Sequence, residues 1–207
     1  MRFEMKIREK LTVVLLFFGA LLSILPLTGN RSFTGNPDEV LSGLLNEDSY
    51  LSADQVARSI VNEDSTIQLI DVREAQAFRE ETFPGAVNVP YQDFTSGDPD
   101  KYLNDKNLKT VFIGNDDYDA ALALAFARGL GYNNTYAMKG GLEGWKTTIL
   151  ESKFNGERIS ARENALFDTR ARAARLFTEL NALPDSLKTR FLESKKFSAK
   201  KLDGGCE

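Results

Sequence analysis

The sequence predicts an α/β domain in which a mostly parallel sheet is covered by helices on both faces. Short β-rich runs at residues 67–72, 110–113 and 135–138 alternate with helical segments, a pattern typical of parallel sheets. The composition, with 42% hydrophobic and 27% charged residues, is that of a globular domain. Ligands of such sheets bind outside the carboxyl ends of the strands, so we seek function in the loops after Val72 and Ile113.

The first element is an apolar segment at residues 11–27, which contains no charged residue and follows four basic ones. As a helix it would be roughly 25 Å long, slightly short of the roughly 30 Å hydrocarbon core of a bilayer. We predict that residues 1–28 are an uncleaved transmembrane anchor, and a signal peptide that is cleaved remains the alternative. The basic flank places the N-terminus in the cytoplasm. In a bacterium the chain would then be a single-pass inner-membrane protein with a periplasmic domain, or a secreted periplasmic protein if cleaved.

The remaining elements follow in order, after a polar, breaker-rich spacer predicted for residues 29–50. We expect the domain to cover residues 51–150. Ser52 as a cap, with Gln55 three residues later, predicts a helix, and Pro90 and Gly131 each end an element. The expected helices are 52–61, 74–80, 120–130 and 142–150, and the expected strands are 67–72, 86–89, 110–113 and 135–138.

Residues 151–207 are predicted to be a C-terminal helix followed by a basic tail. Ser160 with Glu163 predicts the helix start. We expect the helix to pack on the domain, and a dedicated interface with a partner or membrane remains the alternative. The residues expected to pack are Leu166, Phe167, Leu176 and Phe177. The tail, residues 195–207, is Lys-rich and contains the sequence Gly-Gly-Cys.

Residue counts exclude several kinds of site. The chain has no His and a single Cys, Cys206, which excludes a Ser-His-Asp triad, a His/Cys zinc site and an internal disulfide. Residues 30–150 carry ten basic and nineteen acidic side chains. An acidic domain lacks the basic face from which nucleic-acid recognition starts, so no nucleic-acid partner is expected. No cofactor and no metal are predicted.

Three signatures resemble the rhodanese-like domain over roughly residues 51–150. They are Leu-Ile-Asp-Val-Arg at residues 69–73, Pro-Gly-Ala-Val-Asn-Val-Pro at residues 84–90, and Gly-Gly-Leu-Glu-Gly-Trp at residues 140–145. The resemblance implies a rhodanese-like parallel sheet. It also implies sulfane-sulfur transfer through a cysteine persulfide, held in a six-residue loop that opens a helix. Backbone N–H groups of that loop would stabilise thiolate and persulfide.

The loop that corresponds to this site lacks a nucleophile. Gly114 stands where the family has its cysteine, and Asp119 where a cation is often found. We therefore predict no conventional thiosulfate sulfurtransferase activity, and a phosphatase is excluded because it needs the same cysteine. The candidate binding loop is Gly114, Asn115, Asp116, Asp117, Tyr118 and Asp119.

Three interpretations of the acidic loop stay open: the carboxylates cap the following helix, hold a divalent cation, or form a recognition surface. Asp71 and Arg73 are expected to be structural rather than catalytic, because an acid at a strand end and an arginine hold neighbouring loops. The structural signature is Asp71, Arg73, Gly85, Gly140, Gly141 and Trp145.

Cys206 is the candidate catalytic residue, as a sulfur carrier that replaces the missing loop cysteine. Gly204 and Gly205 give it freedom, and Lys200 and Lys201 supply positive charge that favours thiolate. The alternative is a terminal cysteine without a role. Two functions follow. The chain is a membrane-anchored protein for sulfane-sulfur relay with a donor or acceptor protein, or it is a non-catalytic rhodanese-fold module that binds a partner at the membrane.

Overall fold

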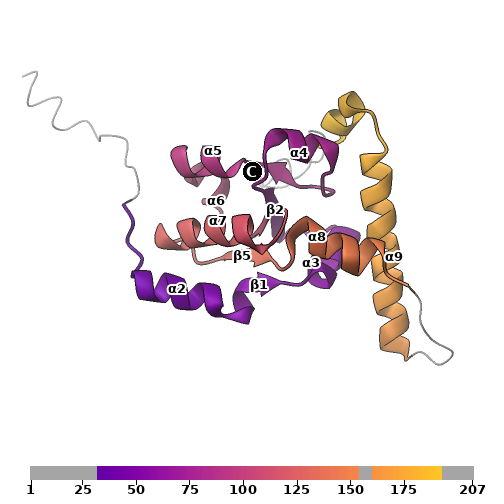
Figure 1. The fold of residues 1–207 in the computed structure, drawn as a ribbon, viewed down its shortest axis with the longest axis horizontal. Helices are drawn as coiled ribbons and strands as arrows, with labels where there is room; N and C mark the ends of the chain where they lie inside the picture. Colours follow the sequence, from indigo (N-terminus) through magenta and orange to yellow (C-terminus); the bar gives the residue numbers. More distant parts are fainter. Residues whose placement is uncertain (1–31, 154–159, 193–207) are drawn as a thin grey trace, which may run out of the picture. The chain divides into compact units, whose positions relative to one another are not determined.

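The computed structural model describes residues 32–153 and 160–192, and those from Phe33 onward form one compact unit. Five parallel strands form one sheet in the order β1-β5-β4-β2-β3 (Figure 1). The strands are β1 (Tyr50–Leu51), β2 (Ile67–Asp71), β3 (Val87–Asn88), β4 (Lys109–Ile113) and β5 (Thr135–Met138). The predicted α/β class with a parallel sheet flanked by helices is confirmed.

Helices connect the strands and extend the domain at both ends. They are α2 (Pro37–Leu45), α3 (Ala53–Val61), α4 (Ala75–Glu80), α5 (Tyr91–Ser96), α6 (Asp100–Leu103), α7 (Asp117–Gly129), α8 (Gly141–Trp145) and α9 (Ala161–Asn181). A 3-10 helix, η1 (Glu47–Ser49), precedes β1, and a π-helix, η2 (Lys146–Leu150), continues α8. Within the described ranges no helix is long and apolar enough to span a membrane, and the predicted anchor at 11–27 lies outside them.

Side chains alternate between the two faces of the sheet, as the period-two geometry of a strand requires. On β4, Val111 and Ile113 point to a core formed with α3, α8 and α9, whereas Phe112 points to a core formed with α5 and α7. Val111, Phe112 and Ile113 are fully buried between the two cores, which is why the second half of β4 is a continuous apolar run. This central strand ends at the candidate loop.

The segment predicted as a spacer contains structure. Asn36 caps α2 by accepting from the backbone N–H of Asp38, and Pro37 occupies the first helical position. Leu44 of this helix packs against the core around α7. The sequence did not predict this helix because its cap and its proline lie in a stretch rich in turn residues.

Helix α9 packs against α3 and α8 and forms part of the first core (Figure 1). The capping box expected at Ser160 and Glu163 is present. Of the four residues expected to pack, Phe177 is buried, Leu166 and Phe167 are half-buried, and Leu176 is 39% exposed. The expectation for Leu176 is wrong, because the helix turns Ala173, Phe177 and Leu180 toward the domain instead.

Polar contacts fix the same C-terminal segment at both ends. Arg170 donates two hydrogen bonds of 2.6 Å to the Asp54 carboxylate on α3. Asn181 accepts from the Thr82 backbone N–H at 2.8 Å and donates to the Thr82 carbonyl at 2.9 Å. Lys188 is buried and donates to the Arg79 carbonyl at 2.8 Å, at the end of α4. The C-terminal segment therefore holds the connection between α4 and β3.

We expect Phe177→Ala to lower the free energy of unfolding by about 3–4 kcal/mol. The Phe177 ring packs between Phe83 and Trp145, with ring centroids 5.3 Å and 5.9 Å away, so its removal leaves a cavity in the core. Denaturant unfolding measures the loss. The control is Leu176→Ala on the exposed face of the same helix, which should change stability by about 0.5 kcal/mol or less. Equal losses for the two variants would contradict this packing.

Candidate functional site

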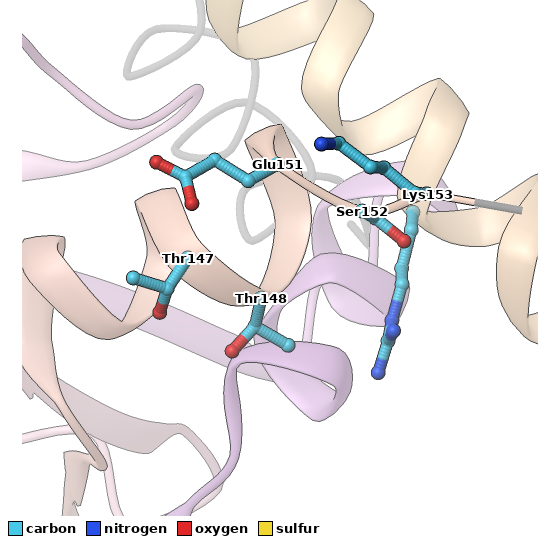
Figure 2. Close-up of a pocket in the computed structure, with 6 residues that line it drawn as sticks. Thr147, Thr148, Glu151, Ser152 and Lys153 are labelled. Atoms are coloured by element: carbon cyan, nitrogen blue, oxygen red, sulfur yellow. The ribbon is translucent and has the colours of Figure 1, made fainter. Parts of the chain in front are cut away.

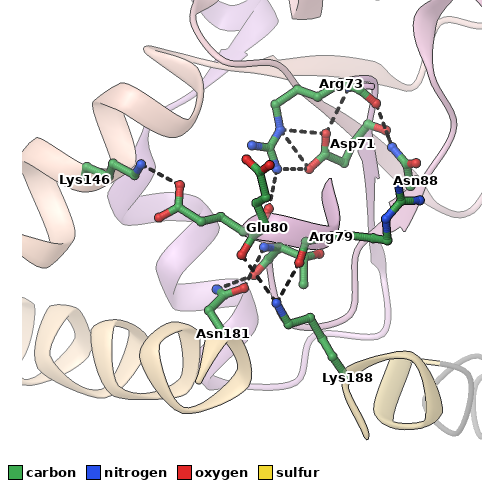
Figure 3. A network of polar contacts seen from close by, with 10 residues as sticks. Asp71, Arg73, Arg79, Glu80, Asn88, Lys146, Asn181 and Lys188 are labelled. Carbon is green, nitrogen blue, oxygen red and sulfur yellow. Dashed lines mark hydrogen bonds and ion pairs between the residues drawn. The ribbon is translucent and has the colours of Figure 1, made fainter. Parts of the chain in front are cut away.

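A buried ion pair stands at the carboxyl end of β2 (Figure 3). The Arg73 guanidinium donates from Nε to Asp71 Oδ1 at 2.9 Å and from Nη2 to Asp71 Oδ2 at 2.6 Å. The Arg73 backbone N–H donates to the same carboxylate at 3.0 Å. Burial raises the pKa of the Asp71 carboxyl, and the hydrogen bonds and charge of Arg73 oppose that rise. The two side chains satisfy each other, so neither is offered to a ligand.

The pair also fixes the loops around it. Arg73 Nη2 donates to the Glu81 carbonyl at 2.6 Å, beyond the end of α4. Asn88 on β3 donates through Nδ2 to the Asp71 carbonyl at 3.0 Å and the Arg73 carbonyl at 2.8 Å. The sequence analysis did not single out Glu81 or Asn88. A polar Asn inside the apolar run 86–89 is the signal that marks Asn88, whereas nothing local marks Glu81.

The candidate loop is shorter than the sequence predicted. Only Gly114, Asn115 and Asp116 lie between β4 and α7, because α7 begins at Asp117 rather than at residue 120. Asp116 is the N-cap, and its Oδ1 accepts from the Tyr118 backbone N–H at 2.8 Å. Asp117 and Asp119 fall in the first turn, where negative charge complements the helix dipole. Among the open interpretations, capping by Asp116 is the one these contacts support.

The loop is joined to the start of α8. Leu142 N–H donates to the Gly114 carbonyl and Glu143 N–H to the Asn115 carbonyl, each at 3.0 Å. The Gly140 backbone N–H donates to Asp117 Oδ1. Gly140 and Gly141 adopt φ values of +77° and +52°, which other residues rarely tolerate. Gly140 and Gly141 therefore serve to hold the candidate loop in place, and they do not line an open binding site.

Little space surrounds the position at which a nucleophile would be attached. A Cβ added to Gly114 would lie 3.0 Å from the Asp116 carbonyl oxygen and the Asp119 Cβ, and 3.1 Å from the Ala120 nitrogen. Those distances are tighter than ordinary van der Waals contact, so the loop backbone would have to shift to admit a side chain. Tyr118, by contrast, is 68% exposed at the rim of the loop.

The other expected residues lie in different surroundings. Trp145 is fully buried against Phe83, with ring centroids 5.0 Å apart. Gly85 has φ +79° in the turn before β3, and a Cβ there would meet no atom within 4 Å. Cys206 lies outside the described residues. In the part of the chain that the structure describes, no group of three or more acidic or thiol side chains is arranged to hold a metal ion.

A polar cavity of about 490 Å³ lies between η2 and α9 (Figure 2). Its lining residues are Thr147, Thr148, Glu151, Ser152, Lys153 and Arg170. None of them comes from the loops at the carboxyl ends of the strands, and Arg170 is already paired with Asp54. This cavity is therefore separate from the candidate loop.

The chain is similar to known proteins over its central part. Residues 52–148 match the family model of the rhodanese-like domain, so the chain contains a rhodanese-like domain over those residues. The chain is similar to thiosulfate sulfurtransferase GlpE of Pseudomonas syringae pv. syringae (strain B728a), at 28% identity over 88 residues, which cover 42% of this chain and 80% of that protein.

Two solved structures are also similar. A rhodanese-related protein from Thermoplasma volcanium has 19% identity and a TM-score of 0.41, covering 47% of this chain and 90% of its own. The rhodanese-like domain of an Anabaena sp. protein has 19% identity and a TM-score of 0.43, covering 54% of this chain and 88% of its own.

Gly141→Ala should disrupt the loop, because the new Cβ would lie 2.6 Å from the Asn115 carbonyl and the Asp116 nitrogen. Gly85→Ala is the matched control, since it carries a similar φ penalty of about 1–2 kcal/mol without a steric clash. Denaturant unfolding should show a larger loss for Gly141→Ala. Hydrogen exchange should show faster exchange of the Leu142 and Glu143 amides in that variant alone. Equal stability and exchange in both variants would show that the loop does not depend on this close approach.

Proposed function

We propose that this chain handles sulfane sulfur without a conventional loop nucleophile, and that Cys206 is the sulfur carrier. The observation that carries the proposal is the combination of a rhodanese-like domain with a crowded glycine where the resemblance expects the cysteine. Cys206 is the one thiol in the chain, so covalent carriage of sulfur by this protein depends on it. The similarity to a protein named as a thiosulfate sulfurtransferase points to the same chemistry.

The proposed loading step uses the Cys206 thiolate and thiosulfate. The thiolate attacks the outer sulfur of thiosulfate, an S–S bond forms to Cys206, and the S–S bond of thiosulfate breaks. Sulfite leaves with the electron pair of the broken S–S bond, and Cys206 becomes a persulfide. The step needs no external oxidant or reductant. An acceptor thiolate then takes the terminal sulfur and regenerates the Cys206 thiolate. The four lysines at positions 195, 196, 200 and 201 would favour the thiolate and the anionic donor.

The length of the tail is compatible with delivery to the domain or to a partner. Lys188 contacts the end of α4, which follows the carboxyl end of β2. Strand β2 pairs with β4, and β4 leads directly into the candidate loop, so the C-terminal segment passes the same edge of the sheet as the loop. Thirteen residues, 193–205, lie between Leu192 and Cys206, and the fourteen steps span at most about 50 Å at 3.3–3.6 Å per residue. In this proposal the apolar segment at 11–27 anchors the protein and places the domain on the periplasmic side of a bacterial inner membrane.

Intact-mass spectrometry of the reduced full chain, after exposure to thiosulfate or polysulfide, tests the carrier. We expect a gain of one sulfur atom per chain, reversed by a reducing agent. Cys206→Ser is the control, and it should gain nothing. A chain that gains no sulfur from either donor, or a Cys206→Ser variant that still gains it, would contradict the proposal.

A second function, partner binding by the loop without chemistry, is favoured by the exposure of Tyr118. Charge reversal at Asp116 or Asp117 would test it poorly, because those carboxylates cap α7 and bind Gly140. Tyr118→Ala leaves these contacts in place. If the loop is a recognition surface, photo-crosslinking in whole cells should link the native chain to a partner. The yield of that adduct should fall about tenfold in Tyr118→Ala, which corresponds to a loss of about 1.4 kcal/mol in binding free energy. An adduct unchanged by Tyr118→Ala would argue against this function.

A further inference from the structure

Three large apolar side chains are exposed at the start of the described chain. Phe33 is 57% exposed, Leu41 is 60% exposed and Leu45 is 81% exposed. Leu41 and Leu45 are four residues apart in α2, so they lie one above the other on one face of the helix. Phe33 precedes α2 in the chain, and we refer to Phe33 and the two leucines of α2 together as the α2 patch.

The fold holds the α2 patch in place. The adjoining side of α2, with the half-buried Val40 and Leu44, packs on the domain, and Leu44 contacts the core around α7. The backbone N–H groups of Thr34 and Gly35 both donate to the Gly129 carbonyl at 3.0 Å. The Phe33 ring lies directly over Gly129, so closely that an added Cβ would be 1.9 Å from it. These apolar groups are therefore presented to the surroundings by a fixed scaffold, which favours an apolar occupant.

The chain length before the patch limits where it can be. Five residues, 28–32, separate the end of the apolar segment 11–27 from Phe33. They span at most about 20 Å. The interfacial layer between hydrocarbon and water is about 5–8 Å thick on each side of a bilayer. If residues 11–27 span the membrane, the patch is confined to the vicinity of the bilayer surface.

We propose that Phe33, Leu41 and Leu45 rest in the interfacial layer of a phospholipid bilayer and dock the domain on the membrane that anchors it. The proposal rests on the membrane anchoring in the proposed function. An amphipathic helix binds such a layer by burying its apolar face. The charged residues of α2 are Asp38 and Glu39, and the helix carries no basic residue. Docking is therefore apolar, and it does not require anionic lipid.

Site-directed fluorescence on the full chain in phosphatidylcholine vesicles tests the docking. The background is Cys206→Ser, with an environment-sensitive label on Leu41→Cys or Leu45→Cys. The matched control is Leu187→Cys, since Leu187 is also an exposed helical leucine, at 47% exposure, but belongs to the C-terminal segment. We expect blue-shifted emission and quenching by spin-labelled lipid at positions 41 and 45, and neither effect at position 187. Addition of 1 M salt should leave the result unchanged.

The possible results separate this proposal from the one on which it rests. If the protein floats with the vesicles and the labels at 41 and 45 behave like the label at 187, docking is overturned and anchoring stands. If the protein does not float with the vesicles, both are overturned. If the labels at 41 and 45 are shielded without lipid quenching, and more so at higher protein concentration, a second copy of the chain covers the patch and lipid docking is overturned.

Discussion

The buried ion pair between Asp71 and Arg73 is the interaction on which the rest of the domain depends. Removing two charges from water costs several kcal/mol for each ion, and the cost is offset only when geometry and hydrogen bonding are nearly complete. Here the Arg73 guanidinium also donates to the Glu81 carbonyl. This bond helps to offset the cost of burying the charge only if the segment after α4 keeps one position. Thr82, the next residue, is held from the other side by Asn181 of α9. The C-terminal helix is thereby part of the support of the central strands.

The same arrangement decides what the neighbouring loop can do. Three hydrogen bonds join the residues after β4 to the Gly140–Glu143 segment. The loop is short because the Asp116 side chain caps α7, which begins at the next residue. A loop whose carbonyls and carboxylates are engaged in this way is rigid and has little room at Gly114. Its exposed features are the Tyr118 side chain and the charge of the first helical turn. Such a loop suits contact with another surface better than covalent chemistry.

Sequence predicted what local physics determines and missed what distant contacts determine. The strands at 67–72, 110–113 and 135–138, and the caps at Ser52 and Ser160, were found because apolar runs and capping pairs are local signals. Helix α7 begins three residues before its predicted start, because the cap is Asp116 and the sequence offers three aspartates, Asp116, Asp117 and Asp119, that could serve as one. Leu176 and Leu180 are equally apolar in sequence, and the face that α9 turns toward the domain decides that Leu180 is the buried one. Pairings across about a hundred residues, such as Thr82 with Asn181, leave no local trace.

The middle of the chain differs in charge from its two ends, which are basic. The domain is acidic, and the three buried charged side chains among the described residues are all bonded. Asp71 and Arg73 pair with each other, and Lys188 donates to backbone carbonyls. In the proposed function the reactive group therefore lies in the tail, which carries the thiol and four lysines. Of the four large hydrophobic side chains that are more than half exposed among the described residues, three (Phe33, Leu41 and Leu45) lie near the start of the domain, toward residues 11–27 in sequence. If Gly114 does stand in place of a nucleophile, as the proposed function holds, the domain contributes a fixed scaffold and an exposed surface, and the covalent step belongs to Cys206.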